Sequence, residues 1–187
     1  MVLSFGGQST RHAIGNITNI HMIRNPLIHP HTNEWLTSSP IAIPYFDGLP
    51  LAFILDSLED ADEREATDAI ESFLRLRPED RLAASPYVDK NYLRIAEAVD
   101  DEDLGCRIDS DEEVWRHVRP TEVFVSRRHR RDRTIYLQIT AECDWEPEHG
   151  LQIVYRRGSE LSRESDFDGH LTYSDAYDLA EEQDRIA

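Results

Sequence analysis

The stretch "RTIYLQITAECDWEPEHGLQIVYRRG", residues 133–158, decides the fold class. Apolar and polar residues alternate in its first half, which places Ile135, Leu137 and Ile139 on one side of a strand. The alternation stops at a group of acids, tryptophan, proline, histidine and glycine, and it resumes at Leu151. Alternation on both sides of a turn predicts an antiparallel hairpin with one buried face.

The neighbouring segments extend this hairpin. "TEVFVSRR" precedes it with the same period of two, and "SELSRES" follows it across the turn residues Arg157 and Gly158. These four runs predict an antiparallel meander. Residues 39–56 predict a separate N-terminal β-hairpin that turns at Asp47 and Gly48.

Helical periods occupy the rest of the chain. Residues 59–98 predict two helices, the first with a buried stripe that runs from Ala66 to Leu74, and the second starting at Pro78. A short capped helix is expected at residues 109–118, and a C-terminal helix with Ser174 as its N-cap is expected at residues 172–187.

Because these elements segregate along the chain, the fold class is expected to be α+β. We expect an antiparallel β-meander plus an N-terminal β-hairpin, with the helices packed on one face. Residues 1–32 carry four of the eight histidines but no sustained period, which indicates a poorly ordered leader. Residues 33–187 then form a single α+β domain.

The charge is strongly acidic and unevenly distributed. The net charge is −17, and residues 56–113 alone hold 20 acids against 7 bases. Such a chain lacks the basic face that nucleic acids and anionic membranes require, and it suits a basic protein partner. The residues expected to bind that partner are Asp100, Asp101, Glu102, Asp103, Asp109, Asp111, Glu112 and Trp145.

Cysteine content and hydropathy bear on the compartment. Cys106 and Cys143 are too few for a disulfide framework, and they lack the spacing of a metal site. The N-terminal residues have no signal-peptide pattern, and no apolar run reaches 18 residues. A reducing cytoplasm is therefore expected.

Two acid and histidine groups are candidates for a divalent metal. The residues concerned are Asp144, Glu146, Glu148, His149, Asp168 and His170. The first group fails the calcium-loop pattern, which needs glycine at the sixth position and glutamate at the twelfth. The alternative is that both groups serve turn geometry. Metal binding requires that the two loops lie at the same end of the sheet.

Other chemistry is weakly indicated, and no catalytic residue or cofactor site is predicted. Cys143 lies near His149, but the alternation places its side chain inside the sheet, where a free cysteine is normally inert. The arginine turn, which we define as residues 127–133 with their five arginines, could contact phosphate. Its alternative role is an exposed turn that pairs internally with the acidic middle of the chain.

Three phrases together carry a family resemblance: "NEWLTSSPIAIPYFDG", "EVFVSRRHRRDRTIYLQITAECDWEPEHGLQIVYRRG" and "DFDGHLTYSDAY". They resemble an uncharacterised bacterial domain family, a domain of unknown function, over roughly residues 33–178. The characteristic motif of this family is Cys-Asp-Trp-Glu-x-Glu-His-Gly-Leu, which this chain carries at residues 143–151. The resemblance implies no functional residues.

Acidic domains of this kind resemble bacterial immunity proteins by analogy. The sequence therefore favours a non-enzymatic protein-binding module, and the analogy suggests an immunity-type protein that occludes a basic toxin or effector. The alternative is a divalent-metal-binding protein that uses the two acid and histidine groups.

Overall fold

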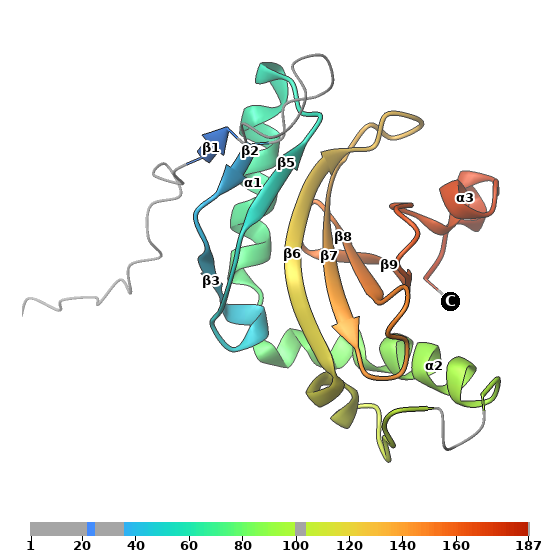
Figure 1. Cartoon of the computed structure of the whole chain (residues 1–187). Helices are drawn as coiled ribbons and strands as arrows, with labels where there is room; N and C mark the ends of the chain where they lie inside the picture. The colour runs from blue at the N-terminus through green and yellow to red at the C-terminus, as the bar shows by residue number, and fades with distance from the viewer. Residues whose placement is uncertain (1–21, 25–35, 100–103, 187) are drawn as a thin grey trace, which may run out of the picture.

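The structure, a computed structural model, describes residues 22–24, 36–99 and 104–186 (Figure 1). Most of the expected leader, and the acids at positions 100–103, lie outside these residues. The strands are β1 Met22–Arg24, β2 Leu36–Ser38, β3 Ile41–Ile43, β4 Leu49–Leu51, β5 Phe53–Asp56, β6 Val118–Arg127, β7 Ile135–Cys143, β8 Leu151–Arg156 and β9 Glu160–Asp166.

The main sheet has seven strands in the order β1-β2-β5-β6-β7-β8-β9. Its larger part is the predicted antiparallel meander β6–β9, and Ile139 of β7 pairs with Val123 of β6 and Ile153 of β8. The N-terminal hairpin β3–β4 forms a small sheet of its own. Asp47 and Gly48 both have positive φ at its turn, as the sequence indicates. The α+β prediction is confirmed.

The sheet is mixed rather than purely antiparallel. β5 lies parallel to β6, with Phe53 opposite Val123. Two parallel neighbours require a long crossover, and the helices between residues 56 and 118 supply it. The sequence did not predict this pairing, because alternation gives the faces of a strand but not the direction of its neighbour.

The two long helices are α1 Glu63–Arg75 and α2 Ser85–Ala96. Pro78 opens a short 3-10 segment, and Pro86 occupies the first turn of α2, so the second helix begins later than predicted. Short 3-10 turns also occur at Pro44–Phe46, Asp60–Asp62, Pro78–Ala83, Glu113–His117 and Glu181–Gln183. None of the helices within the described ranges is long and apolar enough to cross a membrane.

The core lies between the sheet and the two long helices. Phe73 of α1 packs with Tyr155 of β8, and both rings contact Tyr45. The predicted α1 stripe is buried, and Ile135, Leu137 and Ile139 are completely buried. The tip of the β8–β9 hairpin contacts α1 so closely that a Cβ on Gly158 would lie 1.9 Å from the Ala69 carbonyl oxygen.

The C-terminal helix is much shorter than predicted. α3 spans Tyr173–Ala176, and Thr172 rather than Ser174 is its N-cap, accepting a hydrogen bond from the Asp175 backbone N–H. Ser174 instead contacts Arg128. α3 lies beside β9, the edge strand of the sheet (Figure 1). The predicted capped helix at residues 109–118 is likewise reduced to the 3-10 turn Glu113–His117.

Candidate functional site

The loop from Cys143 to Gly150 closes the β7–β8 hairpin. Cys143 is buried, and burial raises the pKa of its thiol to about 12. The thiol is therefore protonated at neutral pH and lacks the thiolate that a nucleophilic cysteine needs. Gly150 has a positive φ, and a Cβ there would lie 2.6 Å from the Ala141 carbonyl oxygen. Turn geometry therefore explains the glycine.

The acids of this loop have separate local partners. Asp144 lies 2.9 Å from Nδ1 of His117 and also pairs with Arg119. The hydrogen bonds from His117 and Arg119 lower the pKa of Asp144. Glu146 instead accepts the backbone N–H groups of residues 148 and 149, and its carboxylate lies 3.3 Å from Nδ1 of His149. Each carboxylate therefore stabilises its own part of the turn.

The second acid group, residues 166–170, is tied to β9 and α2. Both Asp168 oxygens accept hydrogen bonds from Arg163 at 2.6 Å, and this arginine is only 1% exposed. Burial opposes ionisation of Asp168, but the hydrogen bonds from Arg163 and from the His170 backbone N–H outweigh it and lower the pKa. Asp166 pairs with Arg94.

The six predicted metal ligands do not form one cluster. Asp144, Glu146 and Asp168 belong to three different local networks, and the side chains of Glu148 and His149 are exposed. Within the described ranges, no group of three or more His, Cys, Asp and Glu side chains is placed to hold a metal ion. Metal binding stays a prediction, and the observed contacts are those of two turns.

Trp145 joins this loop to α2. Its side chain is 3% exposed, its indole N–H donates to Oδ1 of Asn91 at 2.9 Å, and its ring meets Tyr92 edge-on. Nδ2 of Asn91 in turn donates to Asp166. Trp145 therefore covers the end of the core, and its ring is not exposed for the partner contact that the sequence suggested.

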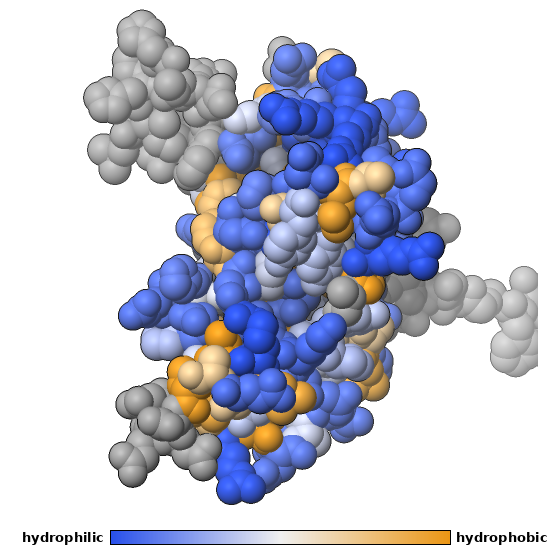
Figure 2. Space-filling view, turned by 90° about the vertical axis from the view of Figure 1, so that its right-hand side faces the viewer, coloured by the Kyte–Doolittle hydropathy of each residue, from blue (hydrophilic) through white to orange (hydrophobic). Residues whose placement is uncertain are grey.

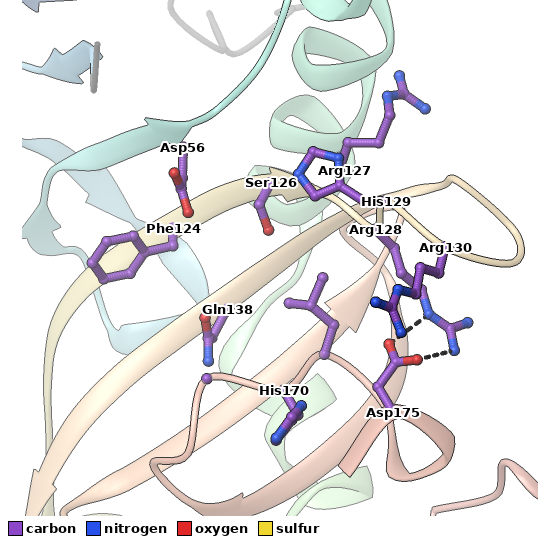
Figure 3. A pocket seen from close by; sticks show the side chains of 12 residues that line it. Asp56, Phe124, Ser126, Arg127, Arg128, His129, Arg130, Gln138, His170 and Asp175 are labelled. Atoms are coloured by element: carbon purple, nitrogen blue, oxygen red, sulfur yellow. Dashed lines mark hydrogen bonds and ion pairs between the residues drawn. The ribbon is translucent and has the colours of Figure 1, made fainter. Parts of the chain in front are cut away.

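Two arginines of the arginine turn are neutralised within the molecule. Arg127 donates to Asp62 at 2.8 Å and to Glu65 at 2.6 Å, both at the start of α1. Arg128 is 3% exposed and pairs with Asp175 of the C-terminal segment (Figure 3). It also pairs with Glu181 of the same segment. Burial of Arg128 opposes its charge, but the hydrogen bonds to these carboxylates outweigh it and raise its pKa.

A third arginine of the turn, Arg131, also pairs within the molecule. Arg131 donates to Glu181 at 2.8 Å and to the Leu179 carbonyl oxygen at 2.7 Å. The carboxylate partners of Arg127 lie in the acidic middle of the chain, whereas those of Arg131 lie in the C-terminal segment. Arg128 pairs with the C-terminal segment and also lies 3.7 Å from Asp132 of the turn itself. Internal pairing is therefore the main role of these three side chains.

A pocket of about 410 Å³ lies on the outer face of the sheet beside this turn (Figure 3). Phe124 and Gln138 line its floor from β6 and β7, and His170, Arg130 and Asp56 line its sides. Two of its arginines, Arg127 and Arg128, already pair with two carboxylates each. Arg130 also lines the pocket and forms no ion pair among the described residues, so phosphate contact at this turn stays a prediction.

A surface on α2 and the following loop collects acids. We call it the α2 surface, and its members are Asp89, Glu97, Asp109, Asp111 and Glu112. Asp109 pairs with Arg107 at 3.2 Å, and the other four form no ion pair within the described ranges. Burial and the neighbouring Asp111 carboxylate raise the pKa of Asp89. Two like charges therefore interact on this surface, and neither Asp89 nor Asp111 forms an ion pair within the described ranges. The last three acids were predicted from the sequence, and the first two were not.

The chain matches the family described as "Domain of unknown function (DUF6985)" over residues 26–171. It therefore belongs to this family, which confirms the resemblance to an uncharacterised domain family. No curated protein and no solved structure matches the chain.

Proposed function

We propose that this member of the DUF6985 family is a non-enzymatic protein-binding module, and that its α2 surface binds a basic protein. In the immunity-type form of the proposal, the partner is a toxin or effector that the chain occludes in the cytoplasm. Two free cysteines, one of them buried, suit that reducing compartment.

The observation that carries this proposal is the uneven use of charge. Among the described residues, eleven arginines form ion pairs within the molecule. They are Arg75, Arg81, Arg94, Arg107, Arg116, Arg119, Arg127, Arg128, Arg131, Arg156 and Arg163. Asp89 and Asp111, by contrast, form no ion pair among the described residues, and the Asp111 carboxylate raises the pKa of Asp89.

Such a surface favours a basic partner for two physical reasons. Excess negative charge steers a positively charged protein and raises the rate of encounter. The fold holds Asp89 and Asp111 where their charges repel each other. A cation of the partner placed between them relieves this repulsion, and the relief adds to the free energy of binding.

Apolar groups lie close to these acids. Leu93 of α2 is 48% exposed, and Tyr177 just after α3 is 64% exposed. Figure 2 views the face that carries α3 and β9; it is mainly hydrophilic, and apolar groups gather in its lower part, at the level of α2. Exposed aromatic and leucine side chains beside complementary charge are typical of protein interfaces.

The test compares three forms of the full chain as bait in cells of the source organism. The α2-surface variant carries Asp89→Asn, Asp109→Asn, Asp111→Asn and Glu112→Gln. A charge-matched control carries Glu59→Gln, Asp68→Asn, Glu122→Gln and Glu148→Gln, which are acids without a side-chain ion pair among the described residues.

We expect a basic protein to be recovered with the wild type and with the control, and to be lost with the α2-surface variant. Co-expression of that partner should stop growth unless the wild-type chain is present. Equal recovery by both variants, or a partner of acidic charge, would contradict the proposal.

A further inference from the structure

A second feature of α2 is a pocket of about 620 Å³ between this helix, β9 and α3. Tyr87, Lys90 and Arg94 line it from α2, Glu164 lines it from β9, and Tyr173 and Tyr177 lie on its far side. It therefore adjoins the acids of the α2 surface.

Glu164 is the unusual group in this pocket. Its side chain is 6% exposed, and its Oε1 atom has no hydrogen-bond partner among the described residues. A β-bulge causes this position: Arg163 pairs with Val154 and Leu161 with Tyr155, so Ser162 is the extra residue. Glu164 then lies opposite Ile153 and faces the helices.

Two of the three cations near Glu164 are engaged elsewhere. Arg94 donates to both oxygens of Asp166 at 2.7 Å, and Arg163 pairs with Asp168. Lys90 forms no ion pair within the described ranges. The Tyr173 hydroxyl donates to the backbone oxygen of Glu164 rather than to its carboxyl group. The carboxyl group therefore forms no ion pair with a described residue, although the unpaired Lys90 lines the same pocket.

This environment determines the protonation of Glu164. Burial and the Asp166 carboxylate raise its pKa, whereas Arg94, Arg163 and Lys90 lower it, and the result is about 8. The Glu164 carboxyl group also interacts electrostatically with Tyr173. The group is mostly neutral at pH 7 and becomes an anion when a cation reaches it.

Aromatic rings stand beside this carboxyl group. Tyr173 and Tyr177 stack with their ring centroids 6.2 Å apart and their planes inclined by 10°. The face of an aromatic ring attracts cations, and an apolar edge such as Leu93 accommodates the methylene stem of a long side chain. Three carboxyl groups, Glu97, Glu164 and Asp166, line the same space as two cations.

We propose that this pocket receives one basic side chain, a lysine or an arginine, from the basic protein that the α2 surface binds. Its cation lies on the Glu164 carboxylate, and its stem lies along Tyr177 and Leu93. Seating the cation releases the proton of Glu164 to solvent. This inference rests on the proposed function, because the partner supplies the side chain.

The test titrates the full chain with Nα-acetyl-lysine amide and Nα-acetyl-arginine amide, followed by NMR. Nα-acetyl-glutamine amide is the neutral probe. We expect saturable shifts at Tyr173, Tyr177 and the Glu164 carboxyl carbon with a basic probe only. Affinity should rise roughly tenfold from pH 6 to pH 7, because the free pocket must ionise Glu164 to bind the cation.

Glu164→Gln keeps the shape of the neutral side chain, and Glu122→Gln serves as the matched control on the outer face of the sheet. The first variant should bind the basic probe at least tenfold more weakly at pH 8 and lose the pH dependence. Equal binding of the neutral probe, or unchanged affinity of Glu164→Gln at every pH, would overturn the inference.

The two proposals fail in different ways. If the α2-surface variant loses the partner while Glu164→Gln binds the basic probes as the wild type does, the pocket inference fails and the proposed function stands. If the pocket binds the basic probes in the predicted pH-dependent way but the α2-surface variant keeps the partner, the pocket chemistry stands and the proposed role of the α2 surface fails.

Discussion

Replacing Glu164 by glutamine should change how the stability of the protein depends on pH. The pKa of Glu164 is about 8 in the folded chain, against an ordinary value of 4.5. Between these two values the folded state holds a proton that the unfolded state has released. The contribution of this group is therefore fully present below pH 4.5 and is lost as the pH rises through 8.

The magnitude follows from the two pKa values. The free energy of unfolding falls by about 1.4 kcal/mol per pH unit where only the folded state is protonated. The slope is smaller near each pKa, so the loss between pH 5 and pH 8 is roughly 3–4 kcal/mol. Glutamine has no such titration, and Glu164→Gln should be nearly as stable as the wild type at pH 5 but more stable at pH 8.

Urea unfolding of both proteins at pH 5, 6, 7 and 8 measures this difference. Comparing the two proteins at each pH cancels the titration of the histidines and of the other acids. Glu122→Gln should differ from the wild type by the same small amount at every pH. The reasoning is refuted if the difference for Glu164→Gln stays constant within about 1 kcal/mol from pH 5 to pH 8.

Three further changes test other parts of the structure. Arg128→Met should lower the free energy of unfolding by about 3 kcal/mol in urea titrations, because it leaves Asp175 and Glu181 without their buried partner. Replacing the exposed Arg130 by Met should lower it by less than about 0.5 kcal/mol. Equal losses would argue against the pairing of Arg128. Gly158→Ala should lower the free energy of unfolding by roughly 2–4 kcal/mol, because the new Cβ would clash with the Ala69 carbonyl oxygen. A Cβ at Gly48 meets open space, so Gly48→Ala should lower it by about 1 kcal/mol. Similar losses for the two variants would contradict the close approach at Gly158. Chelator should leave the melting temperature unchanged and elemental analysis should find no bound divalent metal, whereas a stoichiometric ion whose removal lowers the melting temperature would favour the metal alternative.

Much of the fold could be predicted from local patterns. The alternation in residues 135–143 gives the face of β7 that packs in the core, although Tyr136 and Gln138 on the other face are also buried. The positive-φ pairs at residues 47–48 and 157–158 are hairpin turns that short sequences specify. The direction of β5 beside β6 could not be predicted, because it depends on the path of the chain through α1 and α2. The short C-terminal helix depends on Arg128, which binds Ser174 and Asp175.

The candidate site was less predictable for a specific reason. Strict alternation in "SELSRES" places Leu161 and Arg163 on the same face and Glu164 on the other. The bulge at Ser162 instead places Leu161 and Glu164 toward the core side, so a polar edge strand carries a buried carboxyl group. Asp89 was missed because its neighbour Asp111 is brought near it only by the packing of α2 on the 3-10 turn Glu113–His117.

The partner's footprint tests the central claim most directly. Hydrogen exchange of the chain, measured with and without the recovered partner, reports which backbone amides the complex protects. The account predicts protection in α2 and in residues 104–113, with little change in the arginine turn. Protection confined to the arginine turn and the outer face of the sheet, with α2 unchanged, would contradict it.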